Sequence, residues 1–366
     1  MSTTLHVAEV LHQFLPAYQQ QHVLSHQQEK VCRHITHCRT GQLGMQQWQC
    51  GNCPFEKVVY CSCRDRHCPR CQGRQTQQWI EQQQANVLPC KYFHLVFTLP
   101  HELNVISQYA PEKLYKSLFQ AVWATLSQFA ISRKALKGQL GMTAVLHTWG
   151  QTLTQHIHLH CLIPGGAVDK EAHWRGVNKA YLFPVKALST VFRAKMLVAL
   201  RACEVIIPHA QALMRKAWCV YSKPCLCQPQ TVIRYLGRYT KKGMLQESRL
   251  QGISESGVTF SYQDYADDNR YKQMTLSGEE FLRRYLSHVL PKGLMRVRHF
   301  GFLANCCRVK KLDIIRRQLP EVVEQKSEEE TSNHATCWPC PTCKVGVLTL
   351  MSIALPHVNI QRISSG

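Results

Sequence analysis

The chain has 366 residues, and its 44 Lys and Arg outnumber 23 Asp and Glu, giving a formal charge of +21. This length allows two or three domains, and so strong a positive charge is typical of proteins that bind a polyanion such as nucleic acid. No stretch approaches the roughly 18 uncharged apolar residues of a membrane span, and the start of the chain lacks a secretion signal. We therefore expect no membrane attachment and a cytoplasmic location.

Hydrophobic periodicity, read in chain order, predicts both helices and strands. Expected helices cover 1–30, 73–87, 111–138, 185–217, 231–242 and 279–290. Expected strands cover 92–99, 142–149, 156–163, 258–262 and 271–276. An acidic run over 321–333 has the composition of a solvated linker.

These elements suggest a division into three parts. Residues 1–90 form an N-terminal helix and a cysteine-rich domain, and residues 91–310 form the main domain, with a helical insertion at about 170–220. Residues 311–366 form the acidic linker and a cysteine-containing tail.

The 19 cysteines are concentrated in two places, with eight between Cys32 and Cys71 and three between Cys337 and Cys343. In a chain without a secretion signal, such clustering favours metal binding over disulfides. Two Cys-x-x-Cys pairs lie 14 residues apart, and two such turns can close a sulfur tetrahedron around zinc. The sequence thus predicts one structural Zn²⁺ held by Cys50, Cys53, Cys68 and Cys71.

A second zinc site is an open alternative. The spare ligands near the predicted site are Cys32, Cys38, Cys61, Cys63 and His67. The tail residues Cys337, Cys340 and Cys343 resemble half of a zinc knuckle, and the nearest cysteines that could complete it are Cys306 and Cys307.

A His-x-His-x-His run on a predicted strand forms the second candidate site. Residues two apart on a strand share a face, so His158 and His160 can offer two neutral nitrogens to one divalent ion. Histidines without a metal would also explain the pattern if it stood alone.

The preceding strand offers a third ligand. If 152–155 form a hairpin turn, Trp149 lies opposite His158, and His147 lies opposite His160. His147 is then within reach of the metal, with Gln151 as the competing choice, and a one-residue slip would turn His147 to the other face.

The third candidate site is a tyrosine pair. Tyr235 and Tyr239 lie four apart on a predicted helix and therefore share a face, where either phenol can attack a phosphodiester. The basic residues around them, suited to binding phosphates, are Arg234, Arg238, Lys241 and Lys242. Taken alone, two aromatic residues at this spacing are usually packing residues.

In this order, the motifs resemble one family, the rolling-circle insertion-sequence transposases with an N-terminal zinc-binding domain (the IS91 type). The resemblance spans roughly residues 20–310. The stretches that carry it are 61–71, Phe97-Thr98-Leu99-Pro100, 147–151, 156–160, Pro164-Gly165-Gly166, 234–239, 290–293 and 296–299. One departure is Ile157, which stands where the family carries proline and leaves both histidine ligands in place.

The resemblance implies an α+β fold, an HUH nuclease palm with an antiparallel sheet and flanking helices, preceded by the small zinc-binding domain. It implies that His158 and His160 hold a catalytic Mg²⁺ or Mn²⁺. It further implies that Tyr235 or Tyr239 cuts DNA, leaving a 5′-phosphotyrosine and a free 3′-hydroxyl. The implied partner is DNA, mainly the single-stranded ends of a mobile element in the bacterial cytoplasm, at the nucleoid.

Two alternatives stay open at this point. A replication initiator or a conjugative relaxase would use the same nuclease core. A zinc-containing DNA-binding regulator, or an inactive transposase relic, would need neither the histidine pair nor the tyrosines.

Overall fold

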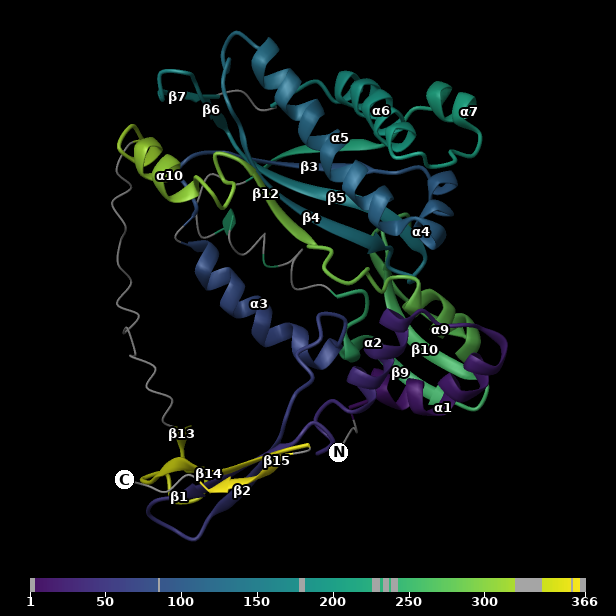
Figure 1. Ribbon diagram of the computed structural model, residues 1–366, viewed down its shortest axis with the longest axis vertical. Helices are drawn as coiled ribbons and strands as arrows, with labels where there is room; N and C mark the ends of the chain where they lie inside the picture. The colour runs from purple at the N-terminus through teal and green to yellow at the C-terminus, as the bar shows by residue number, and fades with distance from the viewer. Residues whose placement is uncertain are drawn as a thin grey trace.

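A computed structural model describes residues 4–84, 86–177, 182–225, 231–232, 237, 243–319, 338–356 and 358–362. Figure 1 shows a large body of sheets and helices, and a smaller sheet, set apart from it, in which strands from residues 45–60 pair with strands from the C-terminal part of the chain. Every pair of neighbouring strands is antiparallel. The expected α+β fold, an antiparallel sheet with flanking helices behind a cysteine-rich N-terminal region, is confirmed.

The central sheet has five strands in the order β12-β4-β5-β3-β8. Their bounds are β3 Tyr92–Thr98, β4 Gly141–Trp149, β5 Gln155–Pro164, β8 Val220–Cys225 and β12 Val297–Gly301. The predictions over 92–99, 142–149 and 156–163 are confirmed as β3, β4 and β5, runs of β-branched and aromatic residues that suit a buried sheet.

One face of this sheet is packed by two long helices, α5 (Pro111–Ser132) and α6 (Val185–Ala202). On β5, Ile157, Leu159 and Cys161 point into this core and are fully buried. Because side chains alternate along a strand, the even-numbered histidines of β5 face the opposite side. The hydrophobic core thereby fixes which face carries the histidines, here called the histidine face.

The N-terminal region contains two helices, α1 (Val7–Gln21) and α2 (His26–Thr36), where the sequence predicted one over 1–30. The break comes from Ser25, whose hydroxyl accepts the Gln28 amide hydrogen as an N-cap of α2. The elements that share a core with α1 and α2 are β9 (Leu250–Ser254), β10 (Gly257–Asp264), β11 (Arg270–Leu276) and α9 (Gly278–Leu286). Packing thus crosses the proposed boundary between the first two parts of the chain.

The smaller sheet, here called the terminal sheet, joins residues 45–60 to the C-terminal part of the chain. Its strands are β1 (Met45–Cys50), β2 (Glu56–Tyr60), β13 (Trp338–Pro339), β14 (Val347–Leu355) and β15 (Val358–Arg362). β1 pairs with β14 from Met45 opposite Ala354 to Cys50 opposite Leu348.

The remaining helices are α3 (Pro69–Gln84), α4 (Ile106–Tyr109), α7 (Ala210–Arg215) and α10 (Arg308–Arg316), with short 3₁₀ turns at His101–Leu103 and Glu247–Arg249. A small hairpin joins β6 (Gly166–Val168) to β7 (Trp174–Gly176). The helices predicted over 73–87, 111–138, 185–217 and 279–290 correspond to α3, α5, α6 with α7, and α9, and the hairpin over 258–276 to β10 and β11. In the described part of the chain, each helix is too short or too polar to span a membrane.

Candidate metal centres

Three histidines from two adjacent strands converge on the histidine face. One ring nitrogen of each of His147, His158 and His160 lies within 4.8 Å of the other two. The Nε2 atoms of His158 and His160 are 3.1 Å apart. Two ligands at right angles on an ion with metal–nitrogen distances near 2.1 Å would be separated by about 3.0 Å, so the pair fits a divalent ion.

The register of β4 and β5 differs from the prediction. His147 lies opposite His158, and a bulge between His147 and Trp149 leaves Trp149 opposite Gln155. The predicted pairings, Trp149 with His158 and His147 with His160, are therefore wrong. Because the pairing of His147 is displaced by two residues, the imidazole stays on the same face and still reaches the other two.

Gln151, the competing choice for third ligand, has another partner. Its amide donates to the Tyr265 hydroxyl at 3.0 Å, in an exposed position beyond the end of β4. The structure brings His147 to the pair, whereas the amide nitrogen of Gln151 is directed to Tyr265.

A hydrogen bond to a carbonyl sets the tautomer of His158. His158 Nδ1–H donates to the backbone carbonyl of His156 at 2.7 Å, which leaves the Nε2 lone pair free. His160 Nδ1 lies 2.9 Å from His94 Nε2, and a proton on His160 Nδ1 would leave its Nε2 unprotonated, as metal binding requires. His158 Nε2 and His160 Nε2, 3.1 Å apart, are close enough to share a proton in a hydrogen bond or to bind one cation.

Burial keeps these rings neutral. Burial lowers the pKa of His158 to about 4, and that of His94 to about 4. Burial and the neighbouring His158 also lower the pKa of His160. Neutral imidazoles are the form that binds metal, so the group is prepared as a ligand set at neutral pH.

Sequence reasoning missed two residues beside this group. His94 on β3 contacts His160 from the next strand, and only the alternation of Tyr92, His94 and Val96 could have indicated its face. Arg296 precedes β12 and donates to His147 Nε2 at 3.2 Å. Burial and the neighbouring Arg66 lower the pKa of Arg296 to about 10, so this guanidinium still carries a charge at neutral pH.

The predicted tyrosine pair and its basic neighbours, Tyr235, Tyr239, Arg234, Arg238, Lys241 and Lys242, lie outside the described residues. Two described residues of the same segment are informative. Val232 is buried against Tyr92 and Leu162, and Leu162 lies two residues beyond His160 on the same face of β5. A Cβ at Gly237 would lie 2.6 Å from Ile80 Cδ1 of α3.

A cavity of about 300 Å³ adjoins the histidine group. Trp149, Arg249, Tyr262 and Tyr271 are among its lining residues. It is close to the histidines because the Trp149 ring stacks on His147 with ring centroids 4.8 Å apart. Aromatic rings and a guanidinium in one open cavity suit a base and its phosphate.

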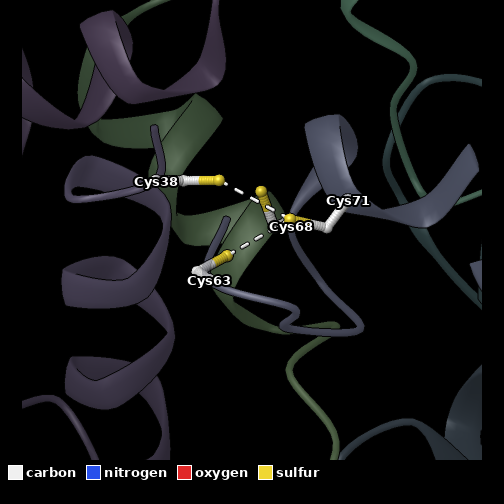
Figure 2. A group of neighbouring side chains, drawn as sticks. All are labelled: Cys38, Cys63, Cys68 and Cys71. Atoms are coloured by element: carbon white, nitrogen blue, oxygen red, sulfur yellow. Dashed lines mark hydrogen bonds between the residues drawn. The ribbon is translucent and has the colours of Figure 1, made fainter. Parts of the chain in front are cut away.

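Four thiols form a separate group between α2 and the start of α3, here called the first cysteine cluster (Figure 2). Its members are Cys38, Cys63, Cys68 and Cys71. Cys71 Sγ lies 3.5 Å from Cys38 Sγ and 3.6 Å from Cys63 Sγ. Sulfurs bound tetrahedrally to zinc at 2.3 Å are about 3.8 Å apart, so the group has the size of a zinc site.

The predicted grouping of Cys50, Cys53, Cys68 and Cys71 is wrong. Cys50 and Cys53 lie on the terminal sheet and meet Cys340 and Cys343 there, in a second cysteine cluster. The β1–β2 hairpin carries the first pair away from the loop that holds the second. The other proposed ligands, Cys32, Cys61, His67, Cys306 and Cys307, belong to neither cluster, and Cys337 lies outside the described residues.

The loop of the first cluster contacts the segment that leads to Arg296. The Arg66 guanidinium donates to the carbonyl oxygens of Pro291, at 2.8 Å, and of Leu294. His67 Nε2 accepts the amide hydrogen of Leu290 at 3.1 Å. The first cluster is thereby tied to the end of the sheet that carries the histidine group.

Two family models match the chain. One, described as "Transposase zinc-binding domain", matches residues 10–99, and another, described as "Putative transposase", matches residues 141–311. The first range contains the whole first cysteine cluster, and the second contains His147, His158 and His160.

Two curated proteins are similar over most of the chain. A protein of Sinorhizobium fredii, "Putative transposase y4qJ", is 35% identical over 377 residues, covering 95% of each chain. The "Transposase for insertion sequence element IS801" of Pseudomonas savastanoi pv. phaseolicola is 30% identical over 292 residues, covering 73% of this chain and 68% of its own. Among solved structures, the conjugative relaxase TrwC in complex with oriT DNA matches with a TM-score of 0.31 and 12% identity, over 73% of this chain and 96% of its own.

Proposed function

Because the chain belongs to the IS91-type transposases with an N-terminal zinc-binding domain, we propose that it moves DNA by cutting and rejoining single strands through a tyrosine nucleophile and a divalent metal. The observation that carries this proposal is the convergence of three histidines on one face of the sheet, with His158 Nε2 and His160 Nε2 3.1 Å apart. A regulator that only binds DNA has no use for such a group.

In this proposal, His158 and His160 would hold Mg²⁺ or Mn²⁺, with His147 as the third ligand once the Arg296 guanidinium releases His147 Nε2. The bound ion would polarise the scissile phosphate and stabilise the charge that develops on the departing 3′-oxygen. His94 would orient His160 through its Nδ1–H, as second partners of metal-binding histidines do.

The nucleophile is the phenol oxygen of Tyr235 or Tyr239. This oxygen attacks phosphorus and loses its proton to solvent, while the bond from phosphorus to the 3′-oxygen breaks and that oxygen takes up a proton. The 5′-phosphate of the downstream part of the strand stays linked to tyrosine, so a later 3′-hydroxyl can reverse the reaction on a new strand without ATP. The burial of Val232 beside Leu162 supports an approach of this segment to the histidine face.

The chain's basic and aromatic groups would bind the strand. Arg296, beside His147, supplies a positive charge for the phosphate, and Arg234, Arg238, Lys241 and Lys242 supply more. Unpaired bases would stack on the aromatic rings of the cavity beside Trp149. Single-stranded ends of a mobile element are the expected substrate.

Covalent trapping tests this proposal. Single-stranded oligonucleotides that tile the DNA flanking the gene, each labelled at the 3′ end, are incubated with the protein and Mn²⁺. We expect a labelled protein band that survives denaturation, because the 3′ part of the oligonucleotide stays on the tyrosine.

The variants separate the roles. Tyr235→Phe with Tyr239→Phe should abolish the band, and His158→Ala with His160→Ala should reduce it at least a hundredfold. Tyr60→Phe, on the terminal sheet and 48% exposed, is the matched control and should trap normally. If the double tyrosine variant still traps DNA, the nucleophile is wrongly assigned, and if the wild type binds the strand without trapping it, the protein is a DNA-binding regulator or an inactive relic.

A further inference from the structure

The second cysteine cluster combines two pairs of thiols that lie almost 300 residues apart in the chain. Cys50 and Cys53 come from the turn between β1 and β2, and Cys340 and Cys343 from the turn between β13 and β14. We infer that these four residues form a second structural zinc site, which fastens the C-terminal tail to the N-terminal zinc-binding region.

The geometry fits a tetrahedral ion. The sulfurs pair across the two turns, with 3.7 Å from Cys50 to Cys343 and 3.7 Å from Cys53 to Cys340. All four lie within 4.8 Å of one another. The separation for four sulfurs on zinc is about 3.8 Å, whereas a disulfide would bring only two sulfurs together, at about 2.05 Å.

Backbone amides are arranged for thiolates. The amide of Asn52 donates to Cys50 Sγ at 3.3 Å, and the amide of Gly346 donates to Cys343 Sγ at 3.2 Å. One such bond comes from each half of the cluster. Hydrogen bonds to charged sulfur favour the deprotonated form that binds metal.

Gly346 also shows how closely the two halves approach. A Cβ at this position would lie 2.4 Å from Cys50 Sγ and 2.7 Å from Asn52 Cβ. A side chain would push the tail turn away from the hairpin turn. The contact therefore requires glycine where the tail closes over the first pair of sulfurs.

Among the described side chains, the terminal sheet has little of the apolar core that would hold the tail without metal. Its buried hydrophobic cluster consists of Cys50, Cys340 and Leu348, with Trp48, Phe55 and the other two cysteines partly buried. Its exposed apolar side chains include Met45, Val58, Tyr60, Trp338, Val347 and Met351. So little burial seldom stabilises a sheet of this size, and small units of this kind generally depend on a metal.

The zinc-binding family model covers only half of this site. That model matches residues 10–99, which include only Cys50 and Cys53 of the second cluster, and the second matched range ends at residue 311. Cys340 and Cys343 lie outside both ranges. The tail thus brings a ligand pair of its own.

Metal content is the first test. Protein purified under reducing conditions should carry two zinc ions per chain, one for each cysteine cluster. The variants Cys50→Ser/Cys53→Ser and Cys340→Ser/Cys343→Ser should each carry one. The quadruple variant should also carry one, because both pairs belong to the same ion.

The matched control uses the other cysteine pair near the tail. Cys306→Ser/Cys307→Ser should keep both ions, since neither residue belongs to a cluster. A wild type with one zinc, a tail variant that keeps two, or a quadruple variant that loses both would overturn the inference. Cobalt substitution gives a second readout, because loss of one four-thiolate site should halve the thiolate-to-cobalt absorption.

A cleavage experiment tests the fastening itself. A protease site is inserted in the acidic stretch between Glu328 and Thr331, and the full-length protein is cut after purification. The C-terminal fragment should co-elute with the rest of the chain when zinc is bound and separate from it in the Cys340→Ser/Cys343→Ser variant. A fragment that separates with zinc still bound, or stays bound in the variant, would show that the ion does not hold the tail.

Discussion

The two cysteine clusters have the same composition and almost the same dimensions, but their surroundings differ. The first cluster belongs to a large core in which Cys38, Cys68 and Cys71 pack with α1, α2 and residues of β10 and α9. The second lies in the terminal sheet, where Leu348 is the one buried aliphatic side chain of its described cluster. A metal in the first would add to a core that is already extensive, whereas a metal in the second would replace a core that is nearly absent.

This difference also separates the two clusters in function. The loop of the first cluster holds the segment around Pro291 through Arg66, and that segment leads to Arg296 beside His147. The described contacts of the second cluster stay within the terminal sheet. We therefore expect damage to the first cluster to reach the histidine group, and damage to the second to stay local.

The largest effect is expected from Cys68→Ser. Cys68 is fully buried, and the change removes one of four ligands within a shared core. Loss of a structural metal is among the few single changes that cost about 4–5 kcal/mol, a large part of the stability of a typical domain. Thermal unfolding and the soluble yield measure this loss.

A cysteine close by provides the control for Cys68→Ser. Cys32 is 2% exposed in the same core but belongs to neither cluster. Cys32→Ala should cost about 1 kcal/mol, as expected for a small buried truncation. Equal losses in the two variants would mean that the first cluster holds no metal of structural importance.

The next largest effect is on the pH dependence of stability. It comes from His288, which lies beside the large core that contains the first cysteine cluster. Its ring is hydrogen-bonded to the carbonyl oxygen of Leu153 and to the hydroxyl of Thr148, and burial lowers the pKa of His288 to about 4. The folded state therefore favours the neutral ring, so its contribution is complete above pH 6.5 and is lost as the pH falls to about 4. This shift in the pKa of His288 corresponds to ~3 kcal/mol of unfolding free energy. The described residues of the terminal sheet contain no histidine, so this effect concerns the large core only.

Urea unfolding at a series of pH values tests this prediction. His288→Gln should flatten the pH dependence of the unfolding free energy relative to wild type. His101→Gln, at a side chain that is 80% exposed, should leave it unchanged. An unaltered pH dependence in the His288 variant would exclude this histidine as a source of acid sensitivity.

Arg66→Ala should have a smaller effect on stability and a distinct one on DNA cleavage. The change removes the hydrogen bonds to the carbonyls of Pro291 and Leu294, at a cost of about 2 kcal/mol. Covalent trapping should slow on the order of tenfold, because the segment that carries Arg296 loses its support.

Arg64, in the same loop and exposed, is the matched control for this loss of charge. Arg64→Ala should change the melting temperature little and weaken trapping less than Arg66→Ala does. If both variants trap DNA equally well, the first cluster does not support the histidine group.

The sequence was sufficient to predict those features of the fold and the site that depend on residues close together in the chain. The strands β3, β4 and β5 follow from their own side chains, and the shared face of His158 and His160 follows from a spacing of two. The face on which His147 lies depended only on whether the strand register was shifted by an even or an odd number of residues. The actual register is displaced by two residues, with a bulge after His147, and therefore keeps His147 on the predicted face. Hydrophobic alternation does not encode that bulge.

Long-range choices could not be predicted in this way. Both Cys-x-x-Cys pairs in the first 90 residues are suitable half-sites, and nothing local determines that each takes its partners elsewhere, one from Cys38 and Cys63 and the other from the tail. His94 and Arg296 reach the histidine group from other parts of the chain, so no motif unites them with it. The spacing of cysteines and histidines in the sequence identifies candidate metal ligands, but the tertiary structure determines which of these ligands come together.

The smallest effect on the large core that contains the first cluster is expected from Gly346→Ala. This variant is also the sharpest test of the difference between the two cysteine clusters. The added methyl group would lie 2.4 Å from Cys50 Sγ, so the two halves of the second cluster should separate and its zinc affinity should fall. Gly51→Ala is the control, since a Cβ there meets nothing within 4 Å in the neighbouring turn. Zinc content should drop from two toward one for Gly346→Ala alone, while the melting temperature of the large core and the rate of covalent trapping stay at wild-type values. A drop in the melting temperature or in the rate of covalent trapping would show that the terminal sheet is coupled to the rest of the protein. Both clusters would then support the histidine group, although to different extents.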